Sequence, residues 1–160
     1  MKGGRPSKRL QKEIAQLADP PPGVRLVGEP VPEKDGVAVI LELRGAPDTL
    51  YAGETFHLKL LCDSHYPFEP PATYFVVDAA RGLAPPCHEH IYCNGHICLS
   101  ILGAEWTPAL TMQNVALSIL SMLSSAQAKK RPEGDQEYAR LMPYGSDPRK
   151  SGWLYDDDKV

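Results

Sequence analysis

The first regular pattern of apolar and polar positions lies near the N-terminus and is helical. Between Ser7 and Leu17, apolar side chains recur at Leu10, Ile14 and Leu17, a spacing of i, i+4 and i+7. This spacing places them on one face of an α-helix. The charged residues of the segment fall mostly off that face: Lys8, Arg9, Lys12 and Glu13. The sequence DPPPG at 19–23 ends the helix, because proline cannot continue one.

Alternation with a period of two then predicts β-strands. The stretch 36–45, GVAVILELRG, and the stretch 55–61, TFHLKLL, both alternate in this way. ATYFVV at 72–77 is rich in β-branched and aromatic residues, and a short strand is expected at 24–27. No segment between these strands is long enough for a crossover helix. We therefore expect a four-stranded antiparallel meander sheet.

Helical periodicity returns in a central helix at 111–125. Thr111 can cap it, and its apolar stripe is formed by Val115, Ile119, Met122 and Leu123. A helix, a small antiparallel sheet and a second helix are typical of an α+β fold with helices packed on the sheet. Between 79 and 109 the periodicity is weak, and irregular segments of this length inside a domain usually carry function.

The C-terminal region is interrupted by residues that break helices. They are Pro132, Gly134, Pro143, Gly145, Pro148 and Gly152. At most one short helix is expected there, near Gln136–Leu141. We therefore predict a core domain over residues 1–140 and a flexible tail over 141–160 that is acidic and aromatic, ending in GWLYDDDKV.

Composition narrows the classes of protein to be considered. The chain has 160 residues, which is one domain with room for a core, and its net charge of −3 offers no broad basic face for nucleic acid. The N-terminal sequence lacks the apolar core of a signal peptide, and no apolar run reaches membrane-spanning length. We expect a cytoplasmic or nuclear protein, no membrane partner, and reduced cysteines.

The segment 87–102, CHEHIYCNGHICLSIL, concentrates the candidate chemistry and allows three interpretations. It could be a metal site, a disulfide cluster or the surroundings of one reactive thiol. The spacing C-x5-C-x4-C lacks the paired C-x2-C of zinc sites, although His88 and His90 form a weak zinc fragment. Cys87, Cys93 and His96 can also be incidental loop residues. Cys62, in a strand, is expected to be a small buried apolar side chain.

The reactive-thiol interpretation centres on Cys98. Asn94-Gly95 is a turn signal just before it, and the apolar residues around it can anchor the segment in the core. A nucleophilic cysteine needs such a fixed position and nearby dipoles. Across the turn, His90 could fold back beside the thiol. Residue types alone leave this interpretation as a hypothesis.

Five motifs in order resemble those of ubiquitin-conjugating enzymes over nearly the full chain. They are SKRLQKEI, GAPDTLYAGETFHLKL, HYPFEPPATYF, HIYCNGHICLSIL and EWTPALT. Within that family the chain is most similar to the W-type branch, which acts on protein N-termini and has His-Pro-His where most members have His-Pro-Asn. Here the corresponding residues are His88, Glu89 and His90. The resemblance implies the ubiquitin-conjugating fold, with an active-site loop between sheet and central helix and a shortened or irregular C-terminal region.

The resemblance also implies a reaction. Cys98 would accept the C-terminal carboxyl group of ubiquitin as a thioester and pass it to an amine of an acceptor protein, here the N-terminal α-amine. His90, at the position of the family's asparagine, could donate to the oxyanion, act as a base or shape the loop. ATP is used by the activating enzyme, so no cofactor and no metal is expected. Glu89 replaces the family's proline and could raise the pKa of the thiol.

Acceptor and partner residues follow from the same resemblance. Asp135 is a candidate for orienting the acceptor amine, and Trp153 and Tyr155 are candidates for contacting a flexible acceptor N-terminus. The positions that would meet the activating enzyme and RING or U-box ligases are Lys8, Arg9, Phe68, Pro108 and Ala109. Two alternatives remain: a non-catalytic variant of the fold that acts as a binding module, and a small zinc-binding domain.

Overall fold

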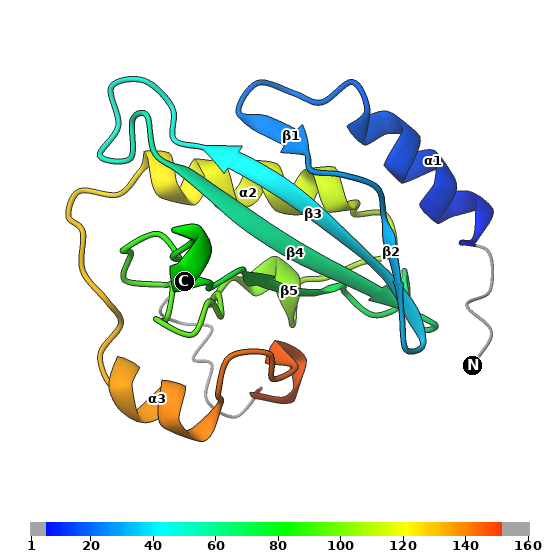
Figure 1. The fold of residues 1–160 in the computed structure, drawn as a ribbon. Coiled ribbons are helices and arrows are strands. Elements are labelled where there is room, and N and C mark those ends of the chain that lie inside the picture. Colours follow the sequence, from blue (N-terminus) through cyan, green and yellow to red (C-terminus); the bar gives the residue numbers. More distant parts are fainter. Residues whose placement is uncertain (1–5, 152–160) are drawn as a thin grey trace.

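The computed structural model describes residues 6–151, and the α+β fold predicted from the sequence is confirmed (Figure 1). Helix α1 spans Lys8–Leu17 and begins at Ser7, whose hydroxyl accepts from the N–H of Leu10. Helix α2 spans Met112–Ser124, and Thr111 caps it as expected. The short helix α3 spans Asp135–Leu141. The described part of the chain also contains three short 3₁₀ helices: η1 (Ala79–Arg81), η2 (Ser100–Leu102) and η3 (Pro148–Ser151).

Within residues 6–151 the sheet has five strands rather than the predicted four. Four of them, β1 (Val24–Leu26), β3 (Gly36–Arg44), β4 (Thr55–Asp63) and β5 (Ala72–Phe75), pair antiparallel in the order β1-β3-β4-β5. The strand missed is β2 (Val31–Glu33), which pairs with the start of β3. Its side chains are exposed or half-buried and it contains Pro32, so neither alternation nor strand propensity marks it. Proline is tolerated here because the strand lies at an edge.

The core lies between one face of the sheet and the two long helices. Alternate residues of β3 and β4 are fully buried, among them Leu41, Leu43, Leu58 and Leu60. In Figure 1, α2 lies behind β3 and β4, and α1 lies beside β1 and β2. This arrangement buries the predicted apolar faces of the helices and leaves the segment between β5 and α2 at one side of the sheet.

Glu13 departs from the predicted exposed face of α1, since only 5% of it is accessible. Its carboxylate accepts from the hydroxyl of Tyr66 at 2.7 Å, the N–H of Met112 at 2.8 Å and the guanidinium of Arg9 at 3.0 Å. These donors compensate the loss of hydration that a buried carboxylate suffers. A helix, a loop after β4 and the start of α2 are therefore joined at one charged side chain.

Residues 142–151, which the sequence analysis assigned to the tail, contact the core. The amide of Asn94 donates to the carbonyl of Met142 at 2.6 Å, and Arg149 forms a 2.8 Å ion pair with Asp63 at the end of β4. Ser151 is fully buried. These contacts correct the expectation of a flexible segment for this part of the tail, whereas the domain boundary near residue 140 stays a prediction. Every helix within 6–151 is too short or too polar to cross a bilayer.

Candidate active site

Cys98 lies just after a tight turn that presses against the sheet. Gly95, with φ of +94°, accepts from the N–H of Phe75 at 2.9 Å, and a Cβ at this position would lie 2.2 Å from the Phe75 carbonyl oxygen. Only glycine fits this backbone and this approach. The N–H of Cys98 then donates to the carbonyl of His90 at 2.8 Å. The turn therefore brings the backbones of these two residues together, and it leaves Cys98 8% exposed.

His88 fixes the backbone of His90 from the other side. Its Nδ1 accepts from the N–H of His90 at 2.9 Å, and the two rings lie 5.4 Å apart. Burial lowers the pKa of His88, and so does the neighbouring His90, whereas a hydrogen bond to the backbone of Met122 opposes this shift. His88 is therefore a neutral, buried acceptor at neutral pH. The side chain of His90 is 22% exposed.

Two side chains from distant parts of the sequence, Tyr51 and Arg131, hydrogen-bond to the backbone of the rest of the loop. Arg131 donates to the carbonyls of Pro86 at 2.6 Å and Ile91 at 3.1 Å. The buried Tyr51 donates its hydroxyl to the carbonyl of Cys87 at 2.5 Å, and burial raises its pKa. Neither residue was a candidate in the sequence analysis, because nothing local to them indicates a partner 36 to 45 positions away.

The proposed acceptor-orienting residue, Asp135, lies at the start of α3 and is buried. Its carboxylate accepts from the backbone N–H of Cys93 at 2.8 Å, and burial together with this carboxylate raises the pKa of the Cys93 thiol. Tyr92 stacks on Tyr138 with ring centroids 3.9 Å apart, and its pKa is raised by burial and then by Cys98. Tyr92 is a neighbour of the thiol that sequence reasoning missed. Trp153 and Tyr155 lie outside the described residues.

His96 is fully buried and is no incidental loop residue. Its Nδ1 lies 2.7 Å from the hydroxyl of Tyr138, and its Nε2 lies 3.1 Å from the carbonyl oxygen of Ser146. Burial lowers the pKa of His96. Because His96 lies two residues before Cys98, these bonds attach the thiol's segment to the C-terminal region.

The three interpretations of the cysteine-rich segment can now be separated. No group of three or more His, Cys, Asp or Glu side chains within 6–151 is arranged to hold a metal ion. All four cysteines belong to that range, and no disulfide joins them. Cys62 is buried, and burial raises its pKa above the ordinary range of thiols. The reactive-thiol interpretation is the one that this geometry favours.

Four of the candidate docking residues are exposed, whereas the fifth, Arg9, is hydrogen-bonded within the protein. Phe68 is 80% exposed, and Pro108 and Ala109 are exposed on the neighbouring loop. The indole N–H of Trp106 donates to the carbonyl of Pro67 at 2.8 Å and so joins the two loops. Lys8 is exposed. Arg9 instead donates to the carbonyls of Pro108 and Leu110, so its side chain connects α1 to the loop before α2.

Comparison with known proteins identifies the family to which the chain belongs. The family model described as "Ubiquitin-conjugating enzyme" matches residues 9–144. The chain belongs to the ubiquitin-conjugating enzyme family. It is 46% identical over 154 residues to ubiquitin-conjugating enzyme E2 W of Caenorhabditis elegans, covering 96% of this chain and 97% of that protein. It is 42% identical to a probable E2 W-A of Danio rerio, covering 94% and 95%.

The solved structures agree with this assignment. A ubiquitin-conjugating enzyme E2, UbcA1, of Agrocybe aegerita superposes with a TM-score of 0.80 at 34% identity, covering 92% of this chain and all of that one. The resemblance to the W-type branch is thereby confirmed, and the chain is a conjugating enzyme whose partners include ubiquitin, an activating enzyme and ubiquitin ligases. Neither the binding-module nor the zinc-domain alternative finds support.

Proposed function

We propose that Cys98 carries ubiquitin as a thioester and transfers it to the N-terminal α-amine of acceptor proteins. The observation that carries this proposal is the 2.8 Å hydrogen bond from the N–H of Cys98 to the carbonyl of His90. It holds the cysteine backbone against the residue that replaces the family's asparagine. The relatives with E2 W in their names, and the W-type motif, support the choice of the α-amine.

The reaction consists of two acyl transfers. The Cys98 thiolate first attacks the thioester of the activating enzyme, whose own thiolate leaves. The acceptor nitrogen then attacks the new thioester carbonyl, an oxyanion forms and collapses, the bond to the Cys98 sulfur breaks, and the nitrogen loses a proton. An imidazole at His90 can donate to the oxyanion or take that proton.

Amine chemistry favours the proposed acceptor. A lysine amine has a pKa of about 10.4, so roughly one in a thousand is neutral at about pH 7.3. An α-amine, with a pKa of about 7.8, is neutral in roughly one case in four. An enzyme that uses α-amines therefore needs less help with deprotonation than one that uses lysine.

The proposal also covers the surfaces that bind partner proteins and the cellular compartment. In this proposal, exposed Phe68, Pro108 and Ala109 form an apolar platform for RING or U-box ligases, and the exposure of Lys8 supports a contact with the activating enzyme. Asp135 could orient the acceptor amine if it releases the Cys93 N–H. Reduced cysteines suit the cytoplasm or nucleus. We propose no cofactor, since the activating enzyme uses the ATP, and no nucleic-acid or membrane partner.

Thioester charging tests the first half of the proposal. The protein is mixed with ubiquitin, an activating enzyme and ATP, then separated with and without reductant. We expect an adduct that reductant removes, that Cys98→Ala abolishes and that Cys98→Ser makes resistant to reductant. Cys93→Ser, in the same loop, should still charge. An adduct that survives in Cys98→Ala would refute the assignment.

Acceptor choice tests the second half. Charged protein is given peptides that carry a free α-amine and no lysine, or a lysine and an acetylated N-terminus. Faster discharge to the first peptide is expected, because more of its amine is neutral. Equal rates at equal concentrations of the two peptides would contradict the proposed specificity.

A further inference from the structure

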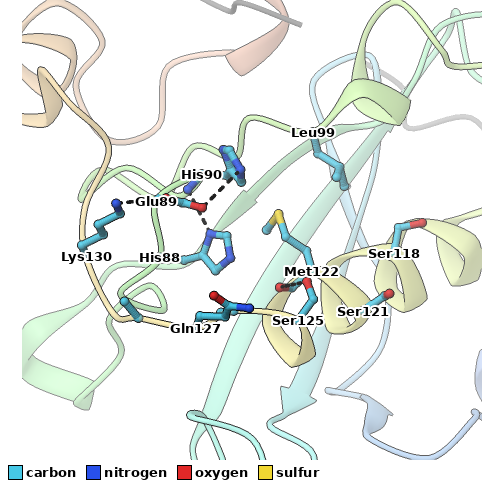
Figure 2. Close-up of a pocket in the computed structure, with 12 residues that line it drawn as sticks. His88, Glu89, His90, Leu99, Ser118, Ser121, Met122, Ser125, Gln127 and Lys130 are labelled. Carbon is cyan, nitrogen blue, oxygen red and sulfur yellow. Dashed lines mark hydrogen bonds and ion pairs between the residues drawn. The ribbon is translucent and has the colours of Figure 1, made fainter. Parts of the chain in front are cut away.

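A cavity of about 610 Å³ opens beside the active-site loop (Figure 2). One wall is formed by His88, Glu89 and His90, with Leu99 next to the thiol's position in the chain. The opposite wall is formed by α2 and the segment that follows it, from Ser118 to Lys130. The cavity therefore adjoins the segment that carries Cys98, whose next residue is Leu99.

Glu89 lines the cavity and lies between two basic side chains. One carboxylate oxygen is 3.9 Å from Nε2 of His90, and the other is 3.3 Å from Nζ of Lys130. Figure 2 shows the carboxylate between these two groups. The side chain of Glu89 is 52% exposed and that of Lys130 is 65% exposed. Ion pairs this exposed contribute little to folding, so stability alone does not explain the arrangement.

The backbone of His90 is fixed, while its ring has fewer constraints. Its N–H is held by His88 and its carbonyl by Cys98. His88 is neutral, because burial lowers its pKa, and so brings no charge to the ring. The negative charge next to the His90 ring is that of Glu89, and Lys130 lies on the far side of this carboxylate.

We propose that Glu89 is a positioning residue that places a negative charge beside the His90 ring and stabilises the imidazolium formed there during transfer. The inference rests on the proposed function. One carboxylate oxygen of Glu89 lies 3.9 Å from Nε2 of His90, which is too far for a hydrogen bond but near enough for its charge to act on the ring. As the acceptor nitrogen bonds to the thioester carbon and the Cys98 sulfur leaves, the nitrogen's proton moves to His90. The imidazolium so formed faces Glu89, and its charge is stabilised there.

One alternative is that Glu89 and Lys130 have a purely structural role, in which their ion pair forms one side of the cavity. A charge swap separates the two, because it restores the ion pair but puts a cation beside His90. A second alternative is that Glu89 attracts the cationic acceptor terminus. In that case its loss would raise KM for the acceptor, whereas loss of a His90 partner lowers kcat at unchanged KM.

The experiment follows discharge of preformed thioester at varied acceptor concentration, with a lysine-free peptide bearing a free α-amine. Glu89→Gln is expected to lower kcat about tenfold at unchanged KM. Lys130→Met should stay within about twofold of the parent, because its cation does not face the ring. The swap Glu89→Lys with Lys130→Glu should stay as slow as Glu89→Gln. Glu133→Gln, an exposed carboxylate in the same connection, is the matched control.

Three outcomes would overturn the inference: parental kcat in Glu89→Gln, a raised KM in place of a lowered kcat, or recovery of the rate in the charge swap. Charging of every variant on Cys98 and the discharge rate of His90→Ala are measured in parallel. If His90→Ala discharges normally, the proposed role of His90 fails together with that of Glu89. If it is slow while Glu89→Gln is not, the inference about Glu89 alone fails.

Discussion

The imidazole of His96 and the hydroxyl of Tyr138 lie 2.7 Å apart, although 42 positions separate them in the chain. The same hydroxyl lies 3.1 Å from the buried Ser151, and the His96 ring also reaches the carbonyl of Ser146. This cluster is a buried polar connection between the segment that carries Cys98 and the C-terminal region up to Ser151. It explains, together with the bond from Asn94 to Met142, why residues 142–151 stay on the core.

Removing that hydroxyl should destabilise the protein. Tyr138→Phe keeps the ring that stacks on Tyr92 but leaves Nδ1 of His96 without this partner in the interior. We expect a loss of about 1–3 kcal/mol in the free energy of unfolding, measured by urea denaturation. Tyr144→Phe, on an exposed ring, is the control. An unchanged free energy in Tyr138→Phe would mean that the hydroxyl is replaced by water.

The stability should depend on pH through the buried histidines. Burial lowers the pKa of both His88 and His96 in the folded protein, so the unfolded chain binds more protons below about pH 6.5. The stability that the two neutral histidines contribute is fully present above about pH 6.5 and is lost progressively as the pH falls below it. Urea denaturation between pH 7.5 and 5 should therefore show falling stability before the carboxylates titrate. Constant stability over this window would contradict the neutral, buried assignment.

The third prediction concerns Glu13, which stabilises the core of the fold rather than the active-site loop. Glu13→Gln replaces a carboxylate that accepts from three donors with an amide whose NH₂ must face one of them. We expect the free energy of unfolding to fall by about 2–4 kcal/mol. Glu29→Gln, an exposed carboxylate, should change it by less than about 0.5 kcal/mol. Equal effects of the two substitutions would rule out a structural role for Glu13.

The sequence predicted the elements whose pattern is local. The stripe of Leu10 and Leu17 and the alternation of β3 and β4 are confirmed, because burial of one face follows directly from periodicity. Strand β2 and the burial of Glu13 were missed. The first depends on pairing with β3, and the second on donors far along the chain.

The candidate site was predictable to the same degree. The turn at Gly95 and the approach of His90 to Cys98 follow from a local turn signal. The side chains that hold the loop in place could not be predicted from the sequence in this way. Tyr51, Arg131 and Tyr138 reach it across 36 to 46 positions, and nothing in their immediate sequence indicates such a contact.

Phe68 should act in ligase docking and not in charging or folding. Phe68→Ala removes an 80% exposed ring, so stability should change by less than about 0.5 kcal/mol and thioester formation should be unaffected. Discharge stimulated by a RING or U-box ligase should fall about tenfold or more, as for loss of an apolar hot spot. Val31→Ala, an exposed apolar residue on β2, is the control. Unchanged stimulation in Phe68→Ala would refute the docking surface.

Arg149 fastens the C-terminal region to the sheet. Its guanidinium lies 2.8 Å from Asp63 and 2.9 Å from Asp147, and hydrogen bonds to these carboxylates raise its pKa although burial opposes the shift. The pairs are about one-fifth exposed, so solvent screens them only in part. Arg149→Met should lower the free energy of unfolding by about 1–3 kcal/mol, less than for a fully buried pair.

A double-mutant cycle assigns that loss to the pair with Asp63. Asp63→Asn in the parent should be destabilising, whereas in Arg149→Met it should cost less, because the carboxylate has already lost its partner. The pair with Glu69 is longer, at 3.9 Å, and Glu69→Gln is the matched control with little coupling. Additive effects of Asp63→Asn and Arg149→Met would show that the two side chains stabilise the protein independently. The C-terminal region would then be held by the His96 cluster rather than by this ion pair.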